Sequence, residues 1–400
     1  MSFCAEVKVR LWLILLLLTQ LLPASAKPTV LWETRCEDAR LVWLSPRGNL
    51  VVLGDSHKLQ IREARTGRIL TTLAGGKQAS FNSDGTRLAV LMSGQPGIRV
   101  FTLPPQGPPR PLWSAQAKPS SEDTLQFSGD GSCVGWCDSK AIKLWRAADG
   151  QALPGPTPPQ IDNFLGMRFA HRGHRLLAWQ DKQALVWDAL TGKGTWFPLE
   201  GDTMHTPQVG EHGSLVVAHN DRKIKIVRIE ADQPRTLAGF SLEKPLRIQA
   251  VQVTPRGELM VQYLKPQNVE GGNVFSRLYT QGGLALAKAH PQGGAWPSDL
   301  EGSSPPPLAD GDSWLVANVN DLDCRGKVLA HPSRVDQVKL LGTDRIASVT
   351  RGGQLLLWSR SGKLHAQLAL DAAWGETCLW VAPDLVAVRC RSSRLKILKP

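Results

Sequence analysis

The 400-residue chain lacks the motifs that would mark a common enzyme class or a membrane protein. No Gly-x-Ser-x-Gly elbow is present, and Gly75-Gly76-Lys77 lacks the upstream Gly and the following Ser or Thr of a phosphate-binding loop. After Leu22 no stretch is apolar enough to cross a bilayer as a helix, which takes roughly 20 residues. These absences disfavour those classes, but they leave open a catalytic site whose residues are scattered over several repeats.

The first 26 residues have the order of a secretory signal peptide. Cations at Lys8 and Arg10 precede a 12-residue apolar core, Leu11–Leu22, and the small residues Ala24-Ser25-Ala26 follow. We therefore expect a signal peptide at 1–26, a single mature domain at 27–400, and an extracytoplasmic location, periplasmic or secreted. No Asn-x-Ser/Thr acceptor site occurs, which favours a bacterial over a eukaryotic secreted protein.

The composition is basic, with a formal net charge of +12. Such a charge would draw an exported protein to anionic partners, such as an acidic polysaccharide or an acidic protein. The alternative is that the positive charge serves only to keep the protein soluble. Nucleic acid is not expected as a partner, because the chain is exported and carries no recognised nucleic-acid-binding motif.

One pattern recurs along the chain: an apolar residue, a polar turn with Gly, and then an apolar strand. The turn glycines are separated by 37, 46, 42, 40 and 44 residues, and they are Gly48, Gly85, Gly131, Gly173, Gly213 and Gly257. This spacing is typical of one four-stranded propeller blade per repeat. About ten residues after each turn a further strand alternates polar and apolar residues, as in Lys223-Ile-Lys-Ile.

Three of these later strands end in a tryptophan followed by a turn: Leu144-Trp145 to Gly150, Val186-Trp187-Asp188 to Gly192, and Leu357-Trp358 to Gly362. They resemble the Trp-Asp strand end of the WD-repeat family, and the resemblance extends over nearly all of residues 28–400. It implies an all-β fold, a β-propeller of four-stranded antiparallel blades. Packing between blades explains these equivalent tryptophans better than a sugar-stacking site does.

Nine repeat turns can be counted, including Asp310-Gly311, Gly342-Thr343 and Pro383-Asp384. Because most propellers have four to eight blades and Ala289–Leu308 is typical of a long loop, we expect eight blades, with seven to nine compatible with the spacing. The last repeat, Leu379–Leu398, supplies three strands, and Thr29–Glu33 supplies one. We expect these ends to pair and close the ring, since closure removes two unpaired strand edges.

Six cysteines follow the predicted cleavage point and permit 15 pairings. A disulfide from Cys36 to Cys390 or Cys378 would clamp the closure; the alternative is buried thiols. Cys133 and Cys137 are too far apart along a strand, about 13 Å, to share a zinc ion. His171 and His174 flank a turn that we interpret as solvated. We therefore expect no metal site and no cofactor.

The turn between the second and third strands of several repeats carries an acid or amide followed by a cation. Since equivalent loops of a propeller lie on one face, these cations would form a ring that attracts an anionic partner; they are Lys58, Lys140, Lys182, Lys223, Arg351 and Arg394. The alternative is an ordinary exposed hairpin, for which Asp, Asn and Lys are common.

Three functions remain open. The sequence favours a monomeric binding scaffold that takes a protein or an anionic glycan. The alternative is a propeller enzyme, a hydrolase or lyase, with its site in the central channel. A structural part of a larger assembly would instead show an exposed apolar patch on the rim.

Overall fold

The computed structural model describes the chain in segments, all of them β-strands and their connections. The described residues are 28–36, 42–55, 57–93, 97–118, 123–157, 164–199, 207–210, 212–220, 223–230, 233–242, 247–253, 259–265, 273–279, 290–292, 315–317, 321–324, 327–330, 335–341, 345–350, 353–359, 361–370, 378–389 and 394–400. The predicted signal peptide and the turns at Gly257, Asp310-Gly311 and Gly342-Thr343 lie outside them. Within these segments no helix is long and apolar enough to cross a membrane.

The described strands form eight four-stranded antiparallel sheets and one sheet of three strands. The first three sheets contain β2 (Val42–Leu44), β3 (Leu50–Gly54), β4 (Lys58–Glu63) and β5 (Ile69–Ala74); β6 (Gly76–Phe81), β7 (Arg87–Met92), β8 (Ile98–Thr102) and β9 (Arg110–Ala115); and β10 (Thr124–Phe127), β11 (Cys133–Cys137), β12 (Ile142–Arg146) and β13 (Ala152–Leu153). The next three contain β14 (Gly166–Phe169), β15 (Arg175–Trp179), β16 (Gln183–Asp188) and β17 (Lys193–Pro198); β18 (Gln208–Val209), β19 (Leu215–His219), β20 (Lys223–Glu230) and β21 (Gln233–Ser241); and β22 (Arg247–Val253), β23 (Leu259–Lys265), β24 (Asn273–Tyr279) and β25 (His290–Gln292). The last three contain β26 (Leu315–Ala317), β27 (Asp321–Cys324) and β28 (Lys327–Ala330); β29 (Val335–Leu341), β30 (Arg345–Thr350), β31 (Gln354–Ser359) and β32 (Leu364–Ala369); and β33 (Cys378–Ala382), β34 (Leu385–Arg389), β35 (Arg394–Lys399) and β1 (Thr29–Arg35).

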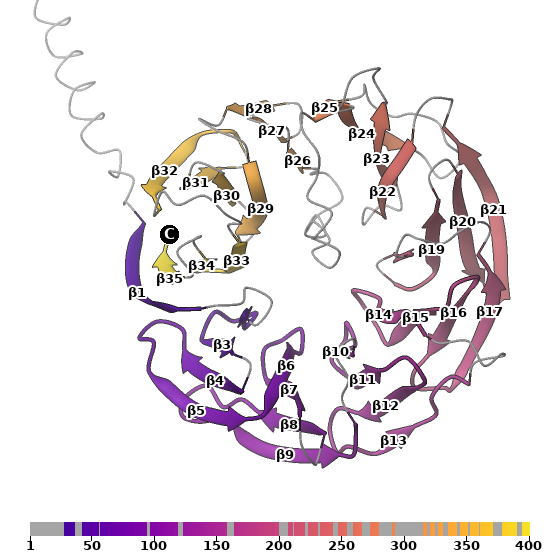
Figure 1. Cartoon of the computed structure of the whole chain (residues 1–400), viewed down its shortest axis with the longest axis horizontal. Helices are drawn as coiled ribbons and strands as arrows, with labels where there is room; N and C mark the ends of the chain where they lie inside the picture. Colours follow the sequence, from indigo (N-terminus) through magenta and orange to yellow (C-terminus); the bar gives the residue numbers. More distant parts are fainter. Residues whose placement is uncertain are drawn as a thin grey trace, which may run out of the picture.

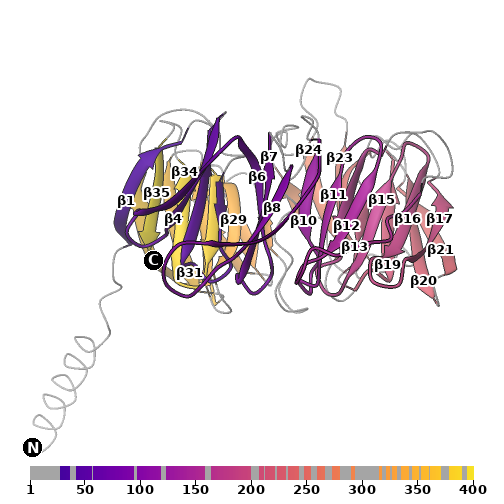
Figure 2. The same ribbon diagram turned by 90° about the horizontal axis from the view of Figure 1, so that it is seen from below.

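The sheets follow one another around a ring, with the first strand of each toward the centre and the fourth on the rim (Figure 1). This is the all-β propeller architecture that the repeat spacing predicts. The described sheets comprise the expected eight of four strands and one further sheet of three, a number within the seven to nine that the spacing allows. Seen from the side, the strands stand across the thickness of the ring, so that the turns lie on its two faces (Figure 2).

The ring is closed by the two ends of the chain, as predicted. β1 pairs antiparallel with β35, from Thr29 opposite Lys399 to Arg35 opposite Arg394, and becomes the fourth strand of the last sheet. β1 ends at Arg35, two residues beyond the end of the predicted strand Thr29–Glu33. The closing sheet therefore has no unpaired edge next to β35, where an open ring would leave one.

The turn glycines adopt the backbone conformation that their position in a tight reversal predicts. The five described members of the repeat, Gly48, Gly85, Gly131, Gly173 and Gly213, have φ between 67° and 83°. A side chain is strained in this left-handed region, which explains the choice of Gly. In these five sheets the repeat seen in the sequence is thus the turn between the first and second strands.

The hydrophobic core consists of separate clusters, each lying between two neighbouring sheets. The cluster between the third and fourth sheets contains Cys133 and Cys137, which are 0% and 3% exposed. This agrees with their interpretation as small core residues of one strand. Burial raises the pKa of Cys137 to about 12, so its thiol stays protonated at neutral pH.

Tryptophans link neighbouring sheets through a repeated contact. Trp113 on the rim strand β9 donates its indole N–H to the carbonyl of Ala147 (3.1 Å), and Trp32 on β1 does the same to Ala64 (2.7 Å). Each indole ring lies against a turn glycine of the next sheet, Gly150 or Gly67. The contact therefore joins the second sheet to the third and also joins the closing sheet to the first.

The predicted packing of the repeat tryptophans between blades holds for Trp145, which lies against Trp113 of the second sheet. It also holds for Trp187, which contacts the end of the third sheet, whereas Trp358 is hydrogen-bonded within its own sheet. Trp145 and Trp358 are 7% and 6% exposed. Trp358 also donates to the hydroxyl of Ser348 on the neighbouring strand (3.1 Å), and Trp187 donates to the carbonyl of Pro154 (3.2 Å). These contacts explain why an indole, which has both a large apolar surface and an N–H donor, occupies the end of the third strand.

The cysteines near the closure lie on different sides of the last sheet. Cys36 belongs to the core cluster shared with the first sheet, whereas Cys378 interacts electrostatically with Lys339 of the eighth sheet. These two cysteines are not bonded to each other, so the Cys36–Cys378 form of the predicted disulfide is not present. Cys390 lies outside the described residues, and a Cys36–Cys390 bond stays a prediction.

Candidate functional site

The alternation of strands sorts the turns onto two faces of the ring. Within each sheet the turn between the second and third strands, here called the second turn, lies at the end opposite to the first and third turns. Because the sheets follow one another in the same orientation (Figure 2), all second turns share one face. We call it the lysine face, after the second-turn residues Lys58, Lys140, Lys182 and Lys223, and call the other the opposite face.

The predicted cations lie at equivalent positions. Lys140 and Lys182 lie within second turns, and Lys58, Lys223 and Arg394 each begin a third strand. Arg351 falls between β30 and β31 and lies outside the described residues. The topology thus places the five described cations at second turns, on one face; whether they bind a partner stays a prediction.

The acid or amide that precedes each cation has a structural role. In the first sheet the carboxylate of Asp55 accepts hydrogen bonds from the backbone N–H groups of His57 (2.8 Å) and Lys58 (3.0 Å). Asp138 accepts in the same way from Lys140 and Ala141, both at 2.7 Å. The backbone bond at His57 is the first reason that the pKa of Asp55 lies below its usual value. The acid that precedes the cation is therefore explained by hydrogen bonds that stabilise the turn.

The second turns are also tied to the connection that leads to the next sheet. The backbone N–H of Gly75 donates to the carbonyl of His57 (2.6 Å), and that of Leu199 donates to Lys182 (2.7 Å). Phe164 and Leu370 make the corresponding bonds to Ser139 and Gly353. The backbone of the lysine face is thus fixed, and the lysine side chains project from it.

The cations differ in their pairing. Arg394 forms an ion pair with Glu33 (2.8 Å), and Lys58 forms a longer one with Asp55 (3.9 Å). Lys140, Lys182 and Lys223 are exposed and form no ion pair with a described residue. These three lysines remain available to an anionic partner, whereas Arg394 serves mainly the ring closure.

The innermost strands carry amides and cations that link neighbouring sheets. The side-chain carbonyls of Gln78 and Gln126 accept the backbone N–H groups of Leu125 (3.1 Å) and Phe169 (3.3 Å) on the next sheet. Arg168 donates to the amide oxygen of Gln208 (2.7 Å), and burial lowers the pKa of this guanidinium. These contacts of the inner strands thus join neighbouring sheets through amide groups and Arg168.

His174 differs from the solvated turn residue that the sequence indicates. Its Nδ1 lies 3.2 Å from a carboxylate oxygen of Asp130 on the third sheet, and its Nε2 lies 3.1 Å from Asp188 on its own sheet. The imidazole therefore bridges two sheets. The contact depends on the spatial neighbourhood of two first turns, which no local sequence signal reveals.

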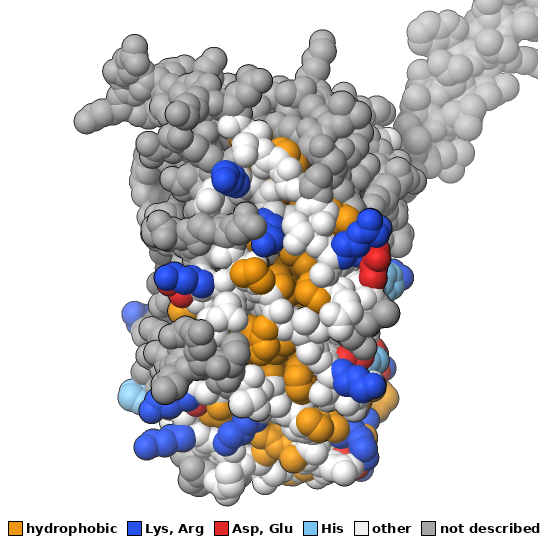
Figure 3. Space-filling view, turned by 90° about the vertical axis from the view of Figure 1, so that its right-hand side faces the viewer, with side chains coloured by type: hydrophobic (Ala, Val, Ile, Leu, Met, Phe, Trp, Pro, Cys, Tyr) orange, Lys and Arg blue, Asp and Glu red, His pale blue; other side chains and the backbone are white. Residues whose placement is uncertain are grey.

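Metal-ligating side chains do not gather in the part of the chain that the structure describes. Among the described residues, no group of three His, Cys, Asp or Glu side chains could hold a metal ion. Four of the large exposed apolar side chains of this part of the chain lie on the rim strands of consecutive sheets: Leu364 on β32, Val30 on β1, Ile69 on β5 and Leu112 on β9. The other two, Leu165 and Leu190, flank strands of the fourth sheet. Figure 3 shows apolar side chains along the middle of one side of the rim, with most Lys and Arg toward its two edges.

Comparison with known proteins identifies the fold and no family. No family model and no curated protein matches the chain. The crystal structure of a computationally designed protein, Ika8, aligns with 92% of this chain and 98% of its own at a TM-score of 0.51 and 16% identity. The β-propeller domain of Cps50 (Swd1) from Myceliophteria thermophila aligns with 93% of this chain and 99% of its own at a TM-score of 0.44 and 13% identity. At such identity the first of these likenesses supports the fold alone.

Proposed function

We propose that this chain is an exported propeller of the WD-repeat type that acts as a monomeric binding scaffold outside the cytoplasm. It takes an acidic protein or an anionic glycan over its lysine face and needs no cofactor. The signal-like residues 1–26 and the Trp-ended third strands support this proposal. Fold alone does not determine function, so the proposal depends on the chemistry of this face.

One observation carries the proposal: equivalent second turns present Lys140, Lys182 and Lys223, each exposed and without an ion pair to a described residue. A lysine ammonium is a strongly hydrated point charge on a flexible stem. Several lysines on one face create a positive potential that speeds the approach of a polyanion. They do little to hold a bound ligand in one orientation. This arrangement suits an extended acidic partner better than a small substrate.

Binding of two soluble polyanions, heparin and polyglutamate, tests the proposal. Lys140, Lys182 and Lys223 are replaced by Ser together, and the matched control replaces three exposed lysines of the opposite face, Lys193, Lys363 and Lys399. Both variants lose the same charge. We expect roughly tenfold weaker binding at low salt for the first variant and a much smaller loss for the control, because the attraction depends on local charge.

The salt dependence of binding and the comparison of the two triple variants together distinguish binding at the lysine face from attraction by the net positive charge. Interactions of exposed charges are screened beyond about 8 Å at physiological ionic strength, so binding of the wild-type protein should weaken steeply with added salt. Equal losses in the two triple variants would show that net charge alone attracts the polyanion, and the lysine face would then have no special role.

A further inference from the structure

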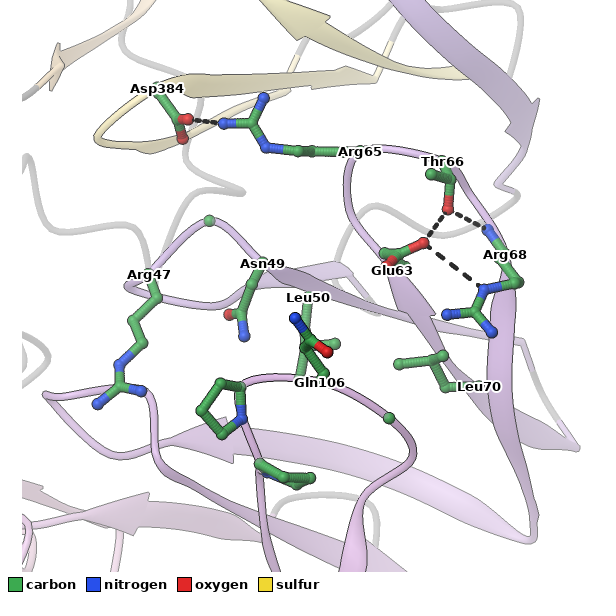
Figure 4. A pocket seen from close by; sticks show the side chains of 14 residues that line it. Arg47, Asn49, Leu50, Glu63, Arg65, Thr66, Arg68, Leu70, Gln106 and Asp384 are labelled. Atoms are coloured by element: carbon green, nitrogen blue, oxygen red, sulfur yellow. Dashed lines mark hydrogen bonds and ion pairs between the residues drawn. The ribbon is translucent and has the colours of Figure 1, made fainter.

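A pocket of about 430 Å³ lies on the opposite face, where the ring closes. Its lining comes from the first and third turns of the first sheet, from the third turn of the second sheet (Pro104–Gly107), and from Asp384 in the first turn of the closing sheet. Figure 4 shows how these turns surround it. Ligand pockets commonly measure about 300–1,000 Å³, so this one has room for a short segment of a ligand.

Three arginines line the pocket, and their partners differ. Arg65 pairs with Asp384 across the closure, and Arg68 pairs with Glu63 at 3.6 Å (Figure 4). Arg47 donates its Nε to the backbone carbonyl of Asp84 (2.5 Å); its charge also interacts with the Asp84 carboxylate, but no ion pair with a described residue forms. Its terminal nitrogens, which suit a planar carboxylate, therefore make Arg47 the preferred anchor for an anion.

The rest of the lining is suited to a peptide. Leu70 and the neighbouring Pro104 and Pro105 supply most of the apolar surface, because Leu50 is a core residue only 6% exposed. The side chains of Asn49 and Gln106 supply amide donors and acceptors. None of the described lining residues is aromatic. Sugar rings commonly stack on aromatic side chains, whereas amides and aliphatic groups match a peptide backbone and an apolar side chain.

We propose that this pocket binds a short acidic peptide segment of a partner protein. One Asp or Glu side chain of the segment pairs with Arg47, and a neighbouring apolar side chain packs on Leu70 and the two prolines. The ion pairs of Arg65 and Arg68 are largely exposed, with side chains 51% and 64% accessible. Such pairs contribute little, so a second carboxylate of the peptide can replace Asp384 or Glu63.

Fluorescence anisotropy of a labelled peptide, Glu-Leu-Glu-Leu-Glu, tests the pocket. We expect Arg47→Gln to weaken binding about tenfold, because the variant loses a charge-assisted hydrogen-bond pair. Arg47→Lys keeps the charge but loses the planar guanidinium. We expect its affinity for the peptide to lie between that of the wild-type protein and that of Arg47→Gln. Arg110→Gln is the control, since Arg110 is an exposed cation of the same face that does not line the pocket.

The outcomes separate this site from the lysine face. Peptide binding that survives Arg47→Gln unchanged, with a wild-type melting temperature, overturns the proposal. Loss in the variant of Lys140, Lys182 and Lys223 but not in Arg47→Gln would assign the peptide to the lysine face instead. A sulfated oligosaccharide that binds more tightly than the peptide, in an Arg47-dependent manner, would show that the ligand is a glycan and would also refute the peptide.

Discussion

The contact between a rim tryptophan and a turn glycine predicts a specific pattern of stability. Gly150 has a φ of 76°, and a Cβ added there would lie 2.8 Å from Cγ and Cδ2 of Trp113. Gly173 has a φ of 83°, with nothing within 4 Å of its added Cβ. Both positions strain an L-residue, but only Gly150→Ala also displaces an aromatic ring of the neighbouring sheet.

The magnitudes follow from these two costs. A left-handed alanine costs about 1–2 kcal/mol, which is the whole expected effect of Gly173→Ala. Overpacking against a ring adds about 1–3 kcal/mol, so Gly150→Ala should cost about 2–5 kcal/mol. Gly67→Ala repeats the test at the ring closure, because its added Cβ would lie 2.8 Å from Cδ2 of Trp32.

Thermal and urea unfolding, followed by circular dichroism, measure the three variants. We expect Gly67→Ala and Gly150→Ala to melt several degrees below Gly173→Ala, at about 2–4 °C per kcal/mol for a large domain. If all three variants lose the same stability, the tryptophan contacts do not hold neighbouring sheets together, and the reasoning is refuted.

Three further predictions concern acid stability and the thiols. Burial raises the pKa of Asp130, but hydrogen bonds from Ser128 and Ser132 outweigh this effect and hold the pKa below its usual value. The ionised carboxylate therefore stabilises the folded protein above about pH 4, and this stabilisation is lost as the pH falls through the folded-state pKa. Asp130→Asn should therefore show a shallower loss of melting temperature below pH 4, and an unchanged slope would contradict this. Cys137, whose pKa burial raises to about 12, should resist iodoacetamide at pH 8 in the folded protein and react once unfolded, so rapid native labelling would exclude a packed thiol. Mass mapping without reduction should link Cys36 to Cys390, and an unlinked Cys36 would remove the predicted clamp.

The fold could be predicted because its signals are local and repeated. A turn glycine such as Gly85 adopts a positive φ, and the few residues around it already specify the turn that requires this conformation. The alternation of Lys223-Ile-Lys-Ile likewise follows from one strand with a packed face and a wet face. Even the closure was predictable, because three strands at one end and one at the other complete a four-stranded sheet.

The contacts between sheets could not be predicted in this way. His174 meets Asp130 across 44 positions of sequence, and Arg65 meets Asp384 across 319. Neither pair leaves a spacing pattern in the chain, since each depends on which turns become neighbours around the ring. The same holds for the pocket, which takes residues from three sheets. The lysines were found because their positions repeat, although the acids beside them proved to be turn-capping residues.

Lysine footprinting in complex with a heparin oligosaccharide tests the central proposal most directly. The protein is acetylated with and without the oligosaccharide, and the protection of each lysine is read by mass spectrometry. We expect protection of Lys140, Lys182 and Lys223, while Lys193, Lys363 and Lys399 on the opposite face react as in the free protein. Protection of the opposite-face lysines, or of none, would contradict the assignment of the lysine face as the binding surface.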